Sequence, residues 1–241
     1  MTEIRITESE QDYLRAIYAL AKRTEGGKVG TVALAERLQI SAASVTNMVK
    51  KLAEHKLVSH SPYQAIALTE AGEKAALEVT RHHRLLETYL RERLDVPWEQ
   101  VHSEADRLEH ALSEDLEARL DAALGHPTTD PHGAPIPTLE GVVHAPRTQQ
   151  LTTAMPGVTV TVMEVEDENR DLLCYLAHLG LTPGARVEVL AKGPFGGPLH
   201  VRVDGKEYAL GEAVTEAVAV RPLEDAGNTA VERKHNEGMG E

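Results

Sequence analysis

The sequence predicts a mainly α-helical chain that ends in a small all-β domain. Apolar residues recur at helical spacing in most segments between Tyr13 and Leu124, and they alternate with period two beyond Met155. A proline-rich stretch, residues 125–137, separates the two patterns. At 241 residues the chain is long enough for more than one hydrophobic core. We therefore expect a composite architecture.

The N-terminal third has the pattern of a winged helix-turn-helix. Residues 8–23 form an amphipathic helix, and two short helices joined by a tight turn follow at 32–38 and 42–55. Residues 57–69 are typical of two short strands around a Ser-Pro turn, which we interpret as the wing. We assign residues 1–69 to a DNA-binding domain.

The exposed positions of the 42–55 helix carry the residue types of a recognition helix. They are small or hydrogen-bonding at its start and cationic further along: Ser41, Ala43, Ser44, Thr46, Asn47, Lys50 and Lys51. In a major groove, short polar side chains approach base edges and cations meet phosphates. The alternative is a plain three-helix core with the same apolar positions, and this pattern alone leaves it open.

The distribution of charge is compatible with DNA binding, although the net charge of −13 taken alone argues against it. Residues 1–69 carry a net charge of +2, residues 70–140 carry −9 and the remainder carries −6. The acidic residues therefore lie outside the proposed DNA-binding segment.

Residues 70–140 combine helices with metal-ligand residue types. We expect one helix from Thr69 to about Asp95 and a second from about Trp98 to Leu124. Asp, Glu and His recur there at spacings of three and four, which share a helix face. These residues are His83 and Glu87 on the earlier helix, and His102, Asp106, Glu109 and His110 on the later one. Two helices carrying such groups can enclose a metal ion; the alternative is a solvated acidic face. His82 faces elsewhere and is expected to be exposed.

Beyond the proline-rich stretch, short alternating valine runs separated by glycines predict a small antiparallel barrel. We assign residues 141–154 to a linker, 155–223 to the barrel and the polar residues 224–241 to a disordered tail. One helix, from about Asn169 to Leu179, interrupts the strands. Cys174 lies among its leucines and is expected to be buried.

Several classes of protein are disfavoured by features that the sequence lacks. The single cysteine excludes an intrachain disulfide and a cysteine-based zinc finger. No signal peptide and no run of 18 apolar residues is present, so we expect a soluble cytoplasmic protein without a membrane partner. No catalytic motif occurs, so we do not expect the protein to be an enzyme. A metalloenzyme that uses the carboxylate cluster stays the alternative, but it would leave the helix-turn-helix unexplained.

Together these segments resemble the diphtheria-toxin-repressor and manganese-transport-regulator (DtxR/MntR) family of metal-dependent bacterial transcription factors. The resemblance covers nearly all of residues 5–140 and rests on motifs that occur in the family's order. They are Glu10–Tyr18, Ile40–Thr46, Leu68–Gly72, His83–Glu87, Val101–Ala105, Leu108–His110 and Asp130–Pro137. It implies a homodimer whose first domain binds a palindromic operator and whose second holds the metal sites and the dimer contact. The C-terminal part resembles the SH3-like (FeoA-like) barrel of longer members.

By position, the resemblance implies two metal sites. The primary site would be Asp12, Asp106, Glu109 and His110. The ancillary site would be His83, Glu87 and His102, completed by Glu164 and Asp167 of the barrel. Iron-type members carry methionine and cysteine at the positions of Asp12 and Asp106. Oxygen donors at both positions favour Mn(II), with Fe(II) as a near neighbour. Arg15 stands where short manganese-type members have a second acid, which argues against a two-metal cluster.

We therefore predict a Mn(II)-activated repressor of metal-uptake genes, with Fe(II) as the second candidate ion, which binds double-stranded operator DNA as a homodimer. A regulator of DNA binding that responds to a small organic ligand is a further alternative. Its DNA binding would be unaffected by a metal chelator.

Overall fold

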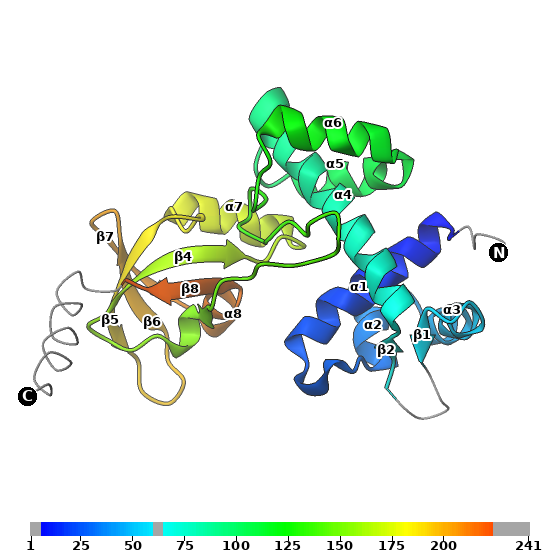
Figure 1. The fold of residues 1–241 in the computed structure, drawn as a ribbon. Helices are drawn as coiled ribbons and strands as arrows, with labels where there is room; N and C mark the ends of the chain where they lie inside the picture. Colours follow the sequence, from blue (N-terminus) through cyan, green and yellow to red (C-terminus); the bar gives the residue numbers. More distant parts are fainter. Residues whose placement is uncertain (1–5, 60–64, 224–241) are drawn as a thin grey trace, which may run out of the picture. The chain divides into compact units, whose positions relative to one another are not determined.

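The computed structural model describes residues 6–59 and 65–223 of the chain (Figure 1). The chain divides into two compact units, which are Met1–Asp130 with Pro135–His144, and Pro131–Ala134 with Ala145–Glu241. The first unit is helical with one small hairpin, and the second is built on a six-stranded antiparallel sheet. The predicted fold class is confirmed. The expected wing tip and the expected disordered tail fall on residues 60–64 and 224–241, outside the described residues.

The first unit opens with the predicted helix-turn-helix, which is confirmed. Its elements are α1 (Glu8–Arg23), the 3-10 turn η1 (Glu25–Gly27), α2 (Thr31–Leu38), α3 (Ala42–Glu54), β1 (Val58–Ser59) and β2 (Ala67–Leu68). A capping box starts α1, because Glu10 accepts hydrogen bonds from the backbone N–H and the hydroxyl of Thr7. The helices pack around fully buried side chains that include Leu14, Leu34 and Leu52.

The long helix α4 (Glu70–Leu94) follows the hairpin directly and packs against α1. Thr69 caps it by accepting a hydrogen bond from the backbone N–H of Gly72. A Cβ atom at Gly72 would lie only 1.8 Å from the carbonyl oxygen of Leu57. Glycine at this position therefore allows α4 to start against the end of the helix-turn-helix.

The region after α4 differs from the expected single helix up to Leu124, and that prediction was wrong. The structure has α5 (Val101–Leu108), the 3-10 turn η2 (Glu109–Ala111) and α6 (Glu114–Leu124). Leu112 is extended, and the Ser113 hydroxyl caps α6 by accepting a hydrogen bond from the backbone N–H of Leu116. A serine at this position offers the backbone a helix start, so the chain breaks there. As a result, Glu109 and His110 lie on a tight turn.

The second unit contains a six-stranded antiparallel sheet in the order β3-β8-β4-β5-β6-β7, with α7 and α8 (Figure 1). Its elements are β3 (Gln149–Gln150), η3 (Leu151–Thr153), β4 (Thr159–Val165), α7 (Arg170–Leu179), β5 (Arg186–Lys192), β6 (Leu199–Val203), β7 (Lys206–Leu210), α8 (Glu212–Glu216) and β8 (Val218–Pro222). Alternate valines of the strands are buried, as period two predicts.

Two details of the second unit differ from expectation. The sheet begins with β3, inside the range expected as a linker, because the adjacent Leu151 is fully buried and holds this segment on the sheet. Cys174 is exposed rather than buried. Leu173 and Leu176 occupy the buried face of α7 instead, and Cys174 points away from it. Among the described residues, no helix is long and apolar enough to cross a membrane.

Candidate functional site

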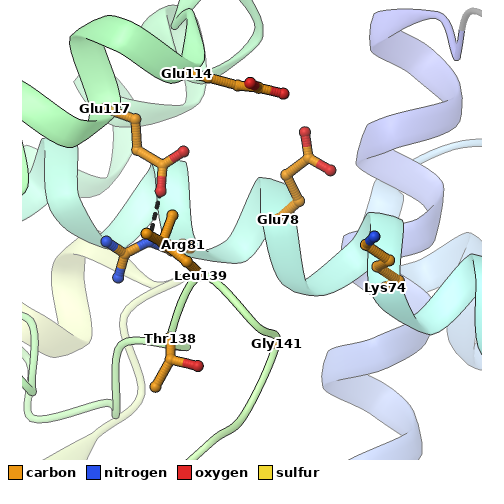
Figure 2. Close-up of a pocket in the computed structure, with 8 residues that line it drawn as sticks. All are labelled: Lys74, Glu78, Arg81, Glu114, Glu117, Thr138, Leu139 and Gly141. Carbon is orange, nitrogen blue, oxygen red and sulfur yellow. Dashed lines mark hydrogen bonds and ion pairs between the residues drawn. The ribbon is translucent and has the colours of Figure 1, made fainter.

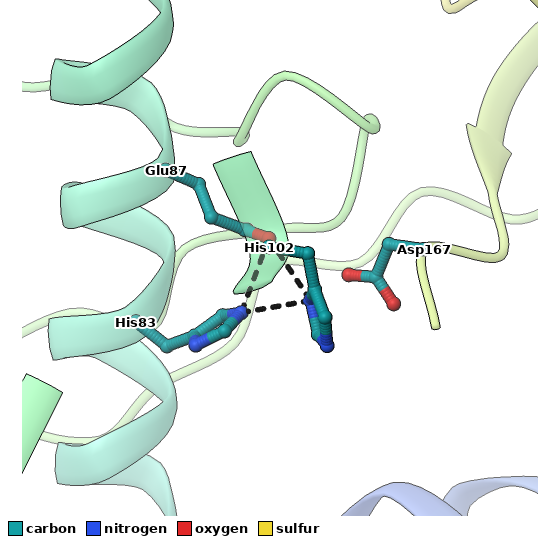
Figure 3. A group of neighbouring side chains, drawn as sticks. All are labelled: His83, Glu87, His102 and Asp167. Carbon is teal, nitrogen blue, oxygen red and sulfur yellow. Dashed lines mark hydrogen bonds and ion pairs between the residues drawn. The ribbon is translucent and has the colours of Figure 1, made fainter. Parts of the chain in front are cut away.

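A first group of ligand-type side chains joins α4 to α5. His83 and Glu87 are four residues apart on α4, and His102 comes from α5, which packs against it. His83 Nε2 lies 3.1 Å from Glu87 Oε1 and 3.0 Å from His102 Nδ1, and His102 Nδ1 lies 3.1 Å from Glu87 Oε1. Figure 3 shows the three side chains pointing toward one another. His83 and Glu87 are buried, and His102 is half-buried.

A second group joins the DNA-binding segment to the helical region. Asp12 of α1 meets Glu109 and His110 of η2, and their ligand atoms lie within 4.8 Å of one another. His110 Nε2 is 2.9 Å from Asp12 Oδ1 and 3.7 Å from Glu109 Oε1. His110 Nδ1 lies 2.7 Å from Gln11 Oε1. The Gln11 oxygen orients the His110 ring, so that Nε2 faces the carboxylates.

Asp106 lies on the other side of Glu109, in a third group with His83. His83 Nδ1 is 2.5 Å from Glu109 Oε2 and 3.4 Å from Asp106 Oδ1. Arg15 of α1 joins this group, with its Nη2 2.6 Å from Asp106 Oδ1. Asp106, expected beside Asp12, therefore has an arginine as its nearest charged partner.

The charges of these groups change the acidity of two members. Burial raises the pKa of Asp12, and the nearby Glu109 carboxylate adds to this rise against the opposing effect of His110. For His83, burial alone lowers the pKa, but the Glu87 carboxylate and hydrogen bonds to Glu109 and Glu87 outweigh it. The pKa of His83 is therefore raised, as expected for an imidazole among carboxylates.

His82 is buried, contrary to the expectation that it is exposed. Its Nε2 lies 3.0 Å from Glu117 Oε2, and Arg81 donates to the other oxygen of the same carboxylate.

Arg81 also lines a pocket of about 280 Å³ with Lys74, Glu78, Glu114, Glu117, Thr138, Leu139 and Gly141 (Figure 2). Lys74, Glu78 and Arg81 repeat at i, i+4 and i+7, and at 100° per residue they lie roughly 140–180° around α4 from His83. This polar cluster is therefore separate from the ligand groups.

Family models match almost the whole length of the chain. Residues 5–66 match the iron-dependent repressor N-terminal DNA-binding domain, and residues 69–138 match the metal-binding and dimerisation domain of the same repressors. Residues 149–222 match the FeoA domain. The iron-dependent repressor IdeR of Mycobacterium tuberculosis is 35% identical over 231 residues, covering 90% of this chain and 99% of the relative. The chain belongs to the diphtheria-toxin-repressor family.

Other relatives agree. The diphtheria toxin repressor of Corynebacterium diphtheriae is 27% identical and covers 90% of this chain and 99% of its own. A solved manganese-dependent transcriptional repressor in complex with manganese is 42% identical, with a TM-score of 0.82, covering 88% of this chain and 99% of that one. Family members are DNA-binding transcriptional repressors, so the metalloenzyme alternative is not supported.

In this repressor the exposed face of α3 carries the predicted DNA-contacting residues. Ser41 caps the helix by accepting a hydrogen bond from the backbone N–H of Ser44. Most of the predicted residues are exposed, namely Ser41, Ala43, Ser44, Asn47, Lys50 and Lys51. Thr46 is half-buried and donates its hydroxyl proton to the Ala42 carbonyl. Which of them contact DNA stays a prediction.

Two residues of α1 escaped the sequence reasoning. Gln11 orients His110, and the fully buried Glu10 reaches toward α3, with Oε1 3.0 Å from His55 Nδ1 and 3.5 Å from Lys51 Nζ. The predicted ligand Asp12 could have drawn attention to both residues, because the residues next to it on the helix point toward other neighbouring elements. Three consecutive residues of α1, Glu10 to Asp12, therefore contact both η2 and the recognition helix. Glu164 and Asp167 belong to the second unit, and their part in the ancillary site stays a prediction.

Replacing Lys50 with alanine is expected to weaken operator binding about equally on all sequences, because a phosphate contact carries no sequence information. The slope of log affinity against log salt should fall by about one unit. Fluorescence anisotropy over a salt series measures both. Lys74→Ala, which removes an exposed cation from α4, is the control and should leave the slope unchanged. A changed operator preference at constant slope would contradict the placement of Lys50.

Proposed function

We propose that this chain is a repressor whose binding to a palindromic operator is activated by Mn(II), with Fe(II) as the second candidate ion. Residues 1–69 bind the operator, residues 70–140 supply most of the metal ligands and the dimer contact, and the protein works in the cytoplasm. Asp12, Glu109 and His110, with Asp106, form the primary site. His83, Glu87 and His102, with Glu164 and Asp167, form the ancillary site. The relative solved with manganese and the iron-dependent relatives support this choice of ions.

The donors at the primary site suit a hard divalent ion. Two carboxylates and one imidazole come together there, and these three groups offer only oxygen and nitrogen donors. Glu109 Oε1 is buried and makes no hydrogen bond to any described residue. This oxygen has charged neighbours, Arg15 Nε at 3.3 Å and His110 Nε2 at 3.7 Å, and its lone pairs accept no hydrogen bond from them, so the atom fits a role as a ligand.

The observation that carries the proposal is that Asp12 lies on α1 while Glu109 and His110 lie on η2. A bound ion supplies positive charge that these donors share. Without it, the Asp12 and Glu109 carboxylates repel each other across the join between α1 and η2. When the ion removes that repulsion, Asp12 keeps α1 in contact with η2. Glu10 pairs with Lys51 and His55, so the position of α1 also affects the recognition helix. In a dimer, this fixes the two recognition helices about 34–36 Å apart, one DNA turn.

The test is an electrophoretic shift of an operator selected from random duplexes in the presence of Mn(II). We expect retardation with Mn(II) and with anaerobic Fe(II), and its loss on adding a chelator. Metal and operator should also tighten each other's binding by the same factor, because linkage is reciprocal. Binding that a chelator does not affect would reject metal control and favour an organic effector.

A further inference from the structure

Glu10 is a fully buried carboxylate that lies between α1 and the end of the recognition helix α3. Its Oε2 accepts hydrogen bonds from the backbone N–H and the hydroxyl of Thr7, at 2.8 Å and 2.7 Å. Such bonds favour the charged form of a carboxyl group. Its Oε1 accepts no hydrogen bond from a described residue and faces His55 Nδ1 at 3.0 Å and Lys51 Nζ at 3.5 Å. A negative charge is therefore fixed next to the cationic end of α3.

Lys51 is one of the two lysines predicted to meet DNA phosphates, and its surroundings differ from those of the other. It follows Ser44 by seven residues and Asn47 by four, so it lies on the same side of α3 as these predicted base contacts. Its side chain is 47% exposed, so DNA and Glu10 can both reach the ammonium. Lys50 is exposed and pairs with no carboxylate in the described part of the chain. Glu10 therefore distinguishes the two lysines.

We propose that Glu10 withholds the Lys51 ammonium from DNA phosphates, and that it is a positioning residue that weakens DNA binding. If Lys51 moved to a phosphate, a fully buried carboxylate would lose the lysine that faces it, and an uncompensated buried charge is costly. One phosphate contact fewer weakens binding to every sequence. A repressor that responds to metal must leave DNA when the metal is absent, and a weaker sequence-independent attraction favours this release. The inference rests on the part of the proposed function that makes α3 the recognition helix, and on neither metal site.

The test measures binding of the full chain to a duplex without operator, with a chelator present, by fluorescence anisotropy over a salt series. Glu10→Gln removes the charge and keeps the start of α1, because glutamine also serves at this position of a capping box. We expect tighter binding and a slope of log affinity against log salt that is steeper by about one unit, because Lys51 then neutralises a phosphate. In the parent protein, Lys51→Ala should leave the slope almost unchanged, whereas Lys50→Ala should lower it.

Glu8→Gln is the matched control, since it removes one acid from an exposed position in the same turn of α1. The inference is overturned if folded Glu10→Gln binds no more tightly than Glu8→Gln, or if its gain survives in the double variant with Lys51→Ala. Should Glu10→Gln not fold, an equal fall in slope for Lys51→Ala and Lys50→Ala overturns the inference by itself. If Lys50→Ala leaves the slope unchanged, the assignment of α3 as the recognition helix fails, and the inference fails with it.

Discussion

Asp12→Ala is expected to abolish most of the metal-activated operator binding while leaving the protein folded and dimeric. Asp12 on α1 lies 2.9 Å from His110 on η2. Without Asp12, Glu109 and His110 remain as ligands on η2, but the ion loses its ligand on the DNA-binding helices. The loss should correspond to an allosteric coupling free energy of about 1–3 kcal/mol, or about 5–150-fold in operator affinity at saturating Mn(II). Anisotropy titrations of operator at fixed Mn(II) measure it.

Two comparisons make this result specific. Glu8→Ala removes an exposed acid from the first turn of α1 and should leave Mn(II) activation intact. The Asp12→Ala protein should still bind metal through His83, Glu87 and His102, because none of these lies on α1. If Asp12→Ala responds to Mn(II) as the parent does, both the primary-site assignment and the coupling mechanism are wrong.

Arg81→Ala is expected to lower the free energy of unfolding of the first unit by about 3–5 kcal/mol, the usual cost of leaving one partner of a buried ion pair alone. Arg81 donates to Glu117 (Figure 2). It also donates, at 2.8 Å, to the Pro137 carbonyl, and its side chain is 8% exposed. Urea unfolding followed by tryptophan fluorescence measures the change. The single tryptophan, Trp98, lies in this unit.

A surface pair provides the control for Arg81. Arg119 lies 2.9 Å from Asp115, but the two side chains are 72% and 78% exposed, so Arg119→Ala should cost little. The double variant Arg81→Met with Glu117→Leu should recover only part of the stability, because neither charge of the pair is left buried alone but His82 loses its Glu117 partner. Equal losses in Arg81→Ala and Arg119→Ala would show that burial does not strengthen this pair.

Much of the fold and of the candidate site was predictable from local spacing. Helical and period-two patterns reflect which side of one element faces the core, and this is a property of a single segment. The pairing of His83 with Glu87 on one face of α4 follows from their separation of four residues. The oxygen donor at Asp12 and the cation at Arg15 were singled out by the family resemblance rather than by spacing.

Contacts between elements depended on the tertiary structure. The position of Asp106 beside Arg15 rather than Asp12 depends on how α1 meets α5 and η2, which no single-segment pattern encodes. Packing also buried His82, because Glu117 of α6 reaches α4 and supplies its hydrogen-bond partner. The sequence by itself thus determined which residue types each helix presents. Which of them meet was decided by side-chain packing between distant segments, because a buried polar group is stable only where the fold brings it a partner.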